Sequence, residues 1–195
     1  TDPCVRGLMK KPPHGTFEDF AAQFKEESRK AGKKQFLVPY FIASHPGSTL
    51  KSMIELAVFL KRNGYKPDQV QDFIPAPFDV ATAMYYTGRD PMTGAEVSIA
   101  KNLRDRRLQR ALLQFFKPEN YFAVHDALVK ARRRDLIGDA CDCLIPGSPP
   151  MAALRARRDS ANKDAHDHVH AQDSPKKGYR PNRPSAKRPP LAGGR

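Results

Sequence analysis

The sequence predicts an α/β fold. Within residues 35–88, two short apolar segments, Phe36–Ala43 and Val70–Ile74, are separated by a helical pattern at Leu50–Asn63. Nearly continuous apolar segments are typical of strands that are covered on both faces in a parallel sheet. Two strands joined by a helix of this length require a right-handed parallel crossover. Each predicted strand ends in polar residues or prolines, and functional residues of α/β proteins lie at the carboxyl ends of their strands.

Four helices are predicted from apolar periodicity, capping residues, and terminal glycines or prolines. They span residues 16–31, 50–63, 103–116 and 118–131, and one further turn is expected at 134–138. Thr16 and Asp19 predict a capping box at the start of the first helix, and Gly64 ends the second. Pro118 ends the third helix and begins the fourth. We therefore expect the last two helices to form an antiparallel pair that packs on the strands.

Composition separates a folded part from a basic tail. Hydrophobic residues make up 39% of the 195 residues, but residues 151–195 contain few aliphatic side chains. This segment carries 11 Lys and Arg against 4 Asp, which is +7 of the formal net charge of +13. A segment that is so polar, charged and proline-rich is expected to be disordered.

Cysteine content and hydropathy indicate a cytoplasmic protein. An odd and sparse set of three cysteines, Cys4, Cys141 and Cys143, forms no disulfide framework and suits a reducing compartment. No run of about 18 apolar residues predicts a membrane span, and no signal peptide is recognised.

Three segments carry a family resemblance: KQFLVPYFIASHPGST, YKPDQVQDFIPAPFDVATAMYYTG, and RRLQRALLQFFKPENY with DLIG. Over roughly residues 4–146 the chain closely resembles the C-terminal third of YgiQ-type radical SAM proteins. Within the wider superfamily, HPGST at 45–49 is similar to the Pro-Gly-Glu-Thr turn after the fifth barrel strand. PAPFDVATA at 75–83 stands where other members have a Pro-Gly-Thr turn after the sixth.

This resemblance implies the C-terminal part of a partial (β/α)6 TIM-type radical SAM barrel. Residues 1–88 would be that barrel part, with Phe36–Ala43 as its fifth strand and Val70–Ile74 as its sixth. Residues 89–147 would be a helical extension of unknown function, and residues 148–195 a disordered basic tail. The missing N-terminal half of the barrel, in the same polypeptide, would then be the partner of this chain. Without it, the strand at 36–43 would expose a long apolar edge, so we expect the isolated chain to aggregate or fold only partly.

The resemblance also implies a [4Fe–4S] cluster and S-adenosylmethionine in the complete protein, where the cluster reductively cleaves the cofactor to a 5′-deoxyadenosyl radical. Three cysteines in a CxxxCxxC motif hold such a cluster, and this chain has no such motif. We therefore assign no metal ligand and no catalytic residue, and we expect this chain alone to bind neither group. It is interpreted as a fragment or remnant of a radical SAM protein that acts on an unidentified substrate.

By resemblance, one wall of the S-adenosylmethionine pocket would consist of five residues at the strand ends: Ile42, Ser44, His45, Phe73 and Pro75. His45 could hydrogen-bond the cofactor or substrate, or instead fix the Pro46-Gly47 turn through its own backbone contacts. Ile42 and Phe73 could pack against adenine, although ordinary core packing is an equal alternative.

Polar and aromatic residues near the second strand could likewise have either a pocket role or a structural role. Tyr85 and Tyr86, with Asp79 and Thr82, could line a substrate pocket, but aromatic residues at helical offsets more often belong to a core. Asp72 lies within an apolar strand and would be costly to bury alone, so we expect it to pair with a Lys or Arg.

Metal binding and nucleic-acid binding are the remaining hypotheses. Cys141 and Cys143 could hold a metal with the alternating histidines at 166–170, although such histidines in a polar tail are more often incidental. Two arginine clusters, one at 104–110 and one at 132–134, could contact phosphates, as could the tail. The tail has a single aromatic residue, Tyr179, so base stacking has little support. A basic nucleic-acid-binding accessory domain is thus the alternative function.

Overall fold

The computed structural model describes residues 2–11 and 15–173. The chain divides into two compact units, residues 1–157 and residues 158–195. The elements in chain order are α1 (Pro3–Leu8), α2 (Phe17–Lys30), β1 (Phe41–Ala43), α3 (Leu50–Arg62), β2 (Val70–Asp72), α4 (Val80–Thr87), α5 (Leu103–Leu113), η1 (Pro118–Asn120), α6 (Tyr121–Lys130), η2 (Arg134–Leu136) and α7 (Met151–Asp173).

A parallel sheet confirms the α/β class. Strands β1 and β2 pair in parallel from Phe41 with Val70 to Ala43 with Asp72, and α3 forms the crossover between them. Within residues 2–11 and 15–173 the sheet has these two strands and does not close into a barrel, so the partial barrel remains a prediction.

Both strands are shorter than the sequence predicts. Residues 36–40 lie outside the β1 ladder, because β2 offers partners only to Phe41–Ala43. Pro39 also lacks the N–H group that a ladder needs. β2 stops at Asp72, although the Phe73 N–H still donates to the Ala43 carbonyl at 2.8 Å. Apolar composition therefore predicted where the strands lie, but the length of each strand depended on how many residues of the other strand could pair with it.

Capping residues fix the helix starts as predicted. Thr16 and Asp19 form the predicted capping box of α2. Thr49 and Ser52 form a second capping box at the start of α3. Gly64, just after α3, has φ of 68°, a left-handed conformation that glycine adopts without strain.

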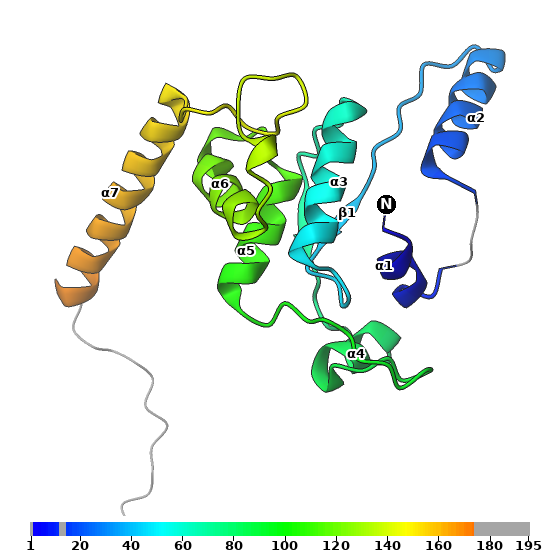
Figure 1. Cartoon of the computed structure of the whole chain (residues 1–195), viewed down its shortest axis with the longest axis horizontal. Coiled ribbons are helices and arrows are strands. Elements are labelled where there is room, and N and C mark those ends of the chain that lie inside the picture. The colour runs from blue at the N-terminus through cyan, green and yellow to red at the C-terminus, as the bar shows by residue number, and fades with distance from the viewer. Residues whose placement is uncertain (1, 12–14, 174–195) are drawn as a thin grey trace, which may run out of the picture. The chain divides into compact units, whose positions relative to one another are not determined.

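Helix α5 is the centre of the first unit. It packs against α3, α6 and both strands, and Figure 1 shows it between α3 and α6. The core consists largely of fully buried side chains from these three helices: Ile54, Leu60, Leu112, Leu113, Val124 and Leu128. Burial of each such side chain contributes roughly 1.5–3 kcal/mol. The predicted pair of helices after residue 100 therefore forms and covers the sheet.

Three helices were not predicted. Asp2 and Asp79 are the N-caps of α1 and α4, and their carboxylates accept hydrogen bonds from the N–H groups of Cys4 and Ala81. The predicted disorder from residue 148 is corrected over Met151–Asp173, where the chain forms α7. This stretch contains no proline or glycine and is rich in alanine, which favours a helix despite its charge. Residues 174–195 of the predicted tail lie outside the described residues.

Candidate functional site

The turn after β1 holds two of the predicted pocket residues in a constrained backbone. Ser44 has φ of 60°, a left-handed conformation that costs a residue with a side chain roughly 1–2 kcal/mol. Gly47 has φ of 86°, and its N–H donates to the Ser98 carbonyl at 2.8 Å. A Cβ atom on Gly47 would clash with Leu8 Cδ1. This position thus requires glycine both for its backbone conformation and for the close approach of α1.

Ser44 and His45 are both buried at this turn, with 3% and 6% of their surface exposed. The Ser44 hydroxyl has no hydrogen-bond partner within the described part of the chain. His45 Nδ1 lies 2.8 Å from the Pro46 carbonyl oxygen. Because a carbonyl only accepts, Nδ1 carries the proton and Nε2 is left as an acceptor in the neutral ring. This contact matches the turn-fixing interpretation of His45.

Burial also controls the ionisation of His45. Removal of the imidazole from water lowers its pKa below the ordinary value of 6.5, and the hydrogen bond to the Pro46 carbonyl opposes this effect. Asp79 and Lys11 exert smaller and opposite electrostatic effects on the same pKa. His45 is therefore neutral at physiological pH.

Phe73 joins His45 at the carboxyl edge of the sheet. The two rings meet edge to face with centroids 5.3 Å apart, and the Phe73 ring also contacts Tyr85 at 5.8 Å. Pro75 follows two residues later and is half-buried. Ile42 is half-buried within β1 and lines a cavity beside α1 that none of these aromatic side chains lines. The structure thus brings Ser44, His45 and Phe73 together.

The polar residues after β2 have structural roles. Asp79 caps α4, and the Thr82 hydroxyl donates to the Ala76 carbonyl at 2.6 Å. Tyr85 packs on Phe73, whereas Tyr86 is mostly exposed and meets Tyr85 edge to face. None of these contacts tests the predicted substrate pocket.

Asp72 pairs with a cation, as its position in an apolar strand predicted. Arg110 Nη1 lies 3.1 Å from Asp72 Oδ2. One turn before Arg110 on α5, Arg106 donates to the Phe73 carbonyl at 3.3 Å. One turn after it, Gln114, the C-cap residue of α5, donates to the Asp68 carbonyl at 2.6 Å. Polar side chains of α5 therefore bond to groups along β2 and the loop before it.

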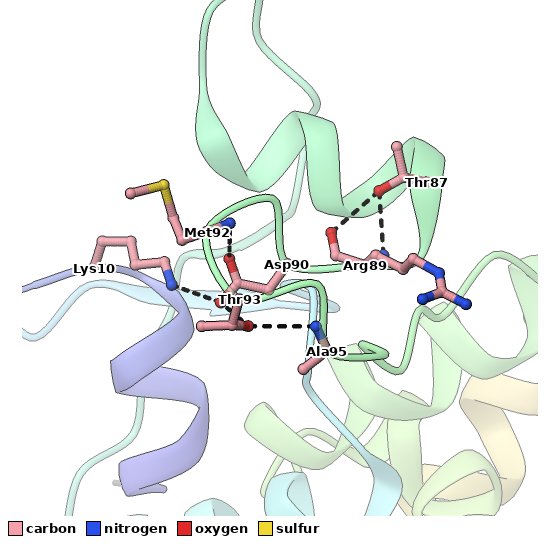
Figure 2. Close-up of polar contacts among 7 residues, drawn as sticks. All are labelled: Lys10, Thr87, Arg89, Asp90, Met92, Thr93 and Ala95. Carbon is pink, nitrogen blue, oxygen red and sulfur yellow. Dashed lines mark hydrogen bonds and ion pairs between the residues drawn. The ribbon is translucent and has the colours of Figure 1, made fainter.

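An ion pair between the segment just after α1 and the loop after α4 was not predicted. Asp90 is almost fully buried, and its carboxylate accepts from Lys10 Nζ at 2.7 Å, the Met92 N–H at 3.0 Å and the Thr93 hydroxyl at 3.1 Å (Figure 2). The hydrogen bond from Lys10 is the main reason that the pKa of Asp90 lies below its ordinary value of 3.8. The turn residues around Asp90 are visible in the sequence, but its partner lies 80 positions away.

The cysteines do not assemble with other ligands. Cys4 and Cys141 are exposed, whereas Cys143 is buried with its Sγ 3.5 Å from the Asp135 carbonyl oxygen. In the described ranges, no three His, Cys, Asp or Glu side chains are grouped so that they could hold a metal ion. The side chains of the histidines at 166–170 lie outside the described residues. In the same described part, no helix is long and apolar enough to cross a membrane.

Comparison with known proteins identifies related sequences. Residues 68–189 match the family described as "Domain of unknown function (DUF3362)". The chain is 50% identical over 142 residues to a UPF0313 protein of Clostridium botulinum (strain 657 / Type Ba4), covering 73% of this chain and 22% of that protein. It is 45% identical over 155 residues to a UPF0313 protein of Methanocella arvoryzae, covering 79% of this chain and 26% of that protein. The chain thus spans about a quarter of the length of these relatives. No solved structure matches it.

Proposed function

Because the chain belongs to the DUF3362 family and corresponds to the C-terminal domain of UPF0313 (YgiQ-type) proteins, we propose that it is the closing part of a cytoplasmic radical SAM protein. Residues 1–88 supply the last two strands of a partial barrel and one wall of its S-adenosylmethionine pocket. The observation that carries this proposal is the parallel unit β1-α3-β2, which places Ser44, His45 and Phe73 together at the carboxyl ends of the strands.

The iron–sulfur cluster does not fit the residues of this chain. The sequence has no CxxxCxxC motif, and the described residues group no three potential ligands. Cluster binding requires three thiolates, and only Cys4 and Cys141 are exposed. In this proposal the cluster is held by another part of the longer polypeptide.

The proposed wall assigns a separate role to each residue. The Ser44 hydroxyl is buried and has no partner among residues 2–11 and 15–173, so it can donate to an acceptor on a ligand. The neutral His45 offers Nε2 as an acceptor. Phe73 is already packed between His45 and Tyr85, which favours a supporting role under the turn over direct contact with adenine. Ile42 and Pro75 are half-buried and retain surface that a ligand can cover.

An exposed apolar row supports the missing barrel half as the partner. Phe36, Val38 and Tyr40 alternate along the segment before β1 and have 74%, 88% and 63% of their surfaces exposed. Side chains two residues apart lie on one face of an extended chain. Near β2, by contrast, polar side chains of α5 bond to the Phe73 carbonyl and to the Asp72 carboxylate. The remaining barrel strands therefore join at β1, where residues 36–40 lack a ladder partner among the described residues.

A chimera tests this function. The matched C-terminal segment of the C. botulinum UPF0313 protein is replaced by this chain, and the protein is reconstituted with iron and sulfide under anaerobic conditions. We expect the relative and the chimera to hold a cluster and to release 5′-deoxyadenosine from S-adenosylmethionine after reduction. A relative that neither holds a cluster nor cleaves the cofactor would refute the proposal.

Two variants of the chimera test the wall. Ser44→Ala and His45→Gln should raise KM for S-adenosylmethionine, because each removes a polar group from the strand ends. His125→Gln is the matched control, since His125 lies on α6 and not at the strand ends. Unchanged KM values in both test variants would reject the wall while leaving the family function in place.

The alternative function, nucleic-acid binding, has less support. Three arginines of the two predicted clusters have partners within the chain: Arg106 bonds to the Phe73 carbonyl, Arg110 to Asp72, and Arg133 to Glu55 and Asp135. These side chains are thus used to hold elements together. No observation on the described residues favours a nucleic-acid partner over a solvated basic surface.

A further inference from the structure

A cavity of about 340 Å³ lies between α1, the start of α2, β1 and α3. Its walls are mainly apolar and include Met9, Phe17, Pro39, Phe41, Met53 and Phe59. The volume is within the range of small-molecule sites, which are typically apolar with a few placed polar groups.

Two of the three charged residues that line this cavity are cations. Neither Arg6 nor Lys11 has a carboxylate partner within the described ranges, and Arg6 Nη1 donates to the Gly15 carbonyl at 3.4 Å. Asp2 is the one lining carboxylate, and its Oδ1 accepts from the Cys4 N–H as the cap of α1. Lys11 directly follows Lys10, which binds Asp90, and Leu8 just before them sits against Gly47, so Lys11 lies near the turn after β1. The ionisable lining residues therefore carry a net charge of +1.

Ser48 adds a free hydroxyl near the same turn. It lines the cavity and has 4% of its surface exposed. Its N–H donates to the His45 carbonyl at 2.8 Å, and its carbonyl accepts from Gln109 Nε2 at 3.1 Å. Only the hydroxyl is left, and it has no partner among the described residues. Ser48 directly precedes Thr49, the N-cap of α3, whose first-turn N–H groups favour negative charge.

Two contacts fix α1 and the residues just after it beside the cavity. Leu8 of α1 sits against Gly47, and Lys10 is bound to Asp90 in the loop after α4 (Figure 2). These contacts hold α1 over the cavity at the end where Lys11 and Ser48 lie.

We propose that this cavity binds a small amphipathic anion, with its apolar body between α1 and α3 and its single anionic end at Arg6, Lys11 and Ser48. The apolar walls accept an unbranched or flat hydrocarbon group. The two cations and the serine hydroxyl can bind a carboxylate or a phosphate. The apolar walls offer no partner for a second charged group on the ligand. Both parts of the ligand are needed, because the walls provide apolar contact and the cations recognise charge.

Methionine methyl groups report on this site directly. The chain has five methionines, of which Met9 and Met53 line the cavity. Met84, Met92 and Met151 do not line it and serve as internal controls. The chain is labelled with ¹³C in its methionine methyl groups, assigned by single Met→Leu variants, and titrated with sodium octanoate. We expect saturable shifts of the Met9 and Met53 signals and unchanged signals from the other three.

Two comparison ligands separate the parts of the site. 1-Octanol has the same chain without the charge, and acetate has the charge without the chain, so both should bind more weakly than octanoate. Arg6→Gln with Lys11→Gln should weaken octanoate binding roughly tenfold or more, because charge-assisted hydrogen bonds are lost. The same change should leave octanol binding unaltered. Arg104→Gln, on the exposed start of α5, is the matched control.

Three results would overturn the proposal: no shift at Met9 and Met53, comparable shifts at all five methionines, or octanoate affinity that is insensitive to Arg6→Gln with Lys11→Gln. If the chain alone gives collapsed methionine signals, the titration is repeated on the chimera, with the same outcomes. Met9 and Met53 signals in the chimera that do not respond to octanoate would mean that polypeptide fills the cavity, which also overturns the proposal. None of these readouts depends on cleavage of S-adenosylmethionine.

Discussion

Replacement of the exposed apolar row before β1 should abolish self-association of the chain. The variant Phe36→Thr with Val38→Thr keeps two residues that favour extended structure and removes two large apolar surfaces. Tyr40 is left in place because its hydroxyl donates to Gln71 and so supports the pairing of β1 with β2.

The magnitude follows from the exposed fractions. Phe36 and Val38 have 74% and 88% of their surfaces exposed, and full burial of such a side chain contributes roughly 1.5–3 kcal/mol. Covering both would therefore contribute about 2.5–5 kcal/mol to association. Loss of this contribution should raise the dissociation constant of the self-associated species on the order of 100-fold or more.

Sedimentation velocity over a concentration series measures this change. We expect the unmodified chain to form larger species and the double variant to be mainly monomeric at the same concentration. The matched control is Met92→Thr with Leu103→Thr, which replaces two similarly exposed apolar residues away from the strands. The reasoning would be refuted if the unmodified chain were a monomer with a sharp cooperative melt. It would also be refuted if the control substitutions reduced self-association as much as the test substitutions.

Two further predictions concern the turn after β1 and are measured on the monomeric double variant by circular dichroism. Gly47→Ala should destabilise the fold by at least about 1–2 kcal/mol from its positive φ alone, with an added cost from displaced Leu8. In a Leu8→Ala background only the backbone cost should remain, and an equal loss in both backgrounds would contradict the predicted clash. Since burial holds the pKa of His45 below 6.5, the unfolded chain binds the proton more readily, and stability should fall as pH drops through 6.5 toward the folded-state pKa. His45→Gln should flatten this dependence and His125→Gln should not; equal pH curves for all three proteins would argue against a buried neutral imidazole.

Local signals in the sequence were sufficient for most helices and for the strand order. Thr16 with Asp19 predicted the start of α2, and Pro118 marked the boundary between α5 and α6, because caps and prolines act through neighbouring backbone groups. The pairing of Asp72 was also predictable, since an isolated carboxylate within an apolar strand is costly. Its partner Arg110, 38 positions away, was not.

Elements that depend on distant contacts or on competing tendencies were missed. α1 has six residues, too few to show a helical period. α7 was predicted to be disordered because its high charge and few aliphatic side chains were given more weight than its alanines. Its buried Ala153 shows that tertiary packing supports the first turn.

By itself, the sequence determined the α/β class, the parallel crossover from β1 through α3 to β2, and the position of Ser44, His45 and Phe73 at the strand ends. These follow from hydrophobic periodicity and from turn residues, which act over a few positions. Only the tertiary structure decided that β1 has three residues, that Lys10 binds Asp90, and that α1 covers a cavity above α3. Such features depend on which distant segments meet, because strand length, ion pairing and enclosed volume are properties of two packed surfaces and not of one stretch of chain.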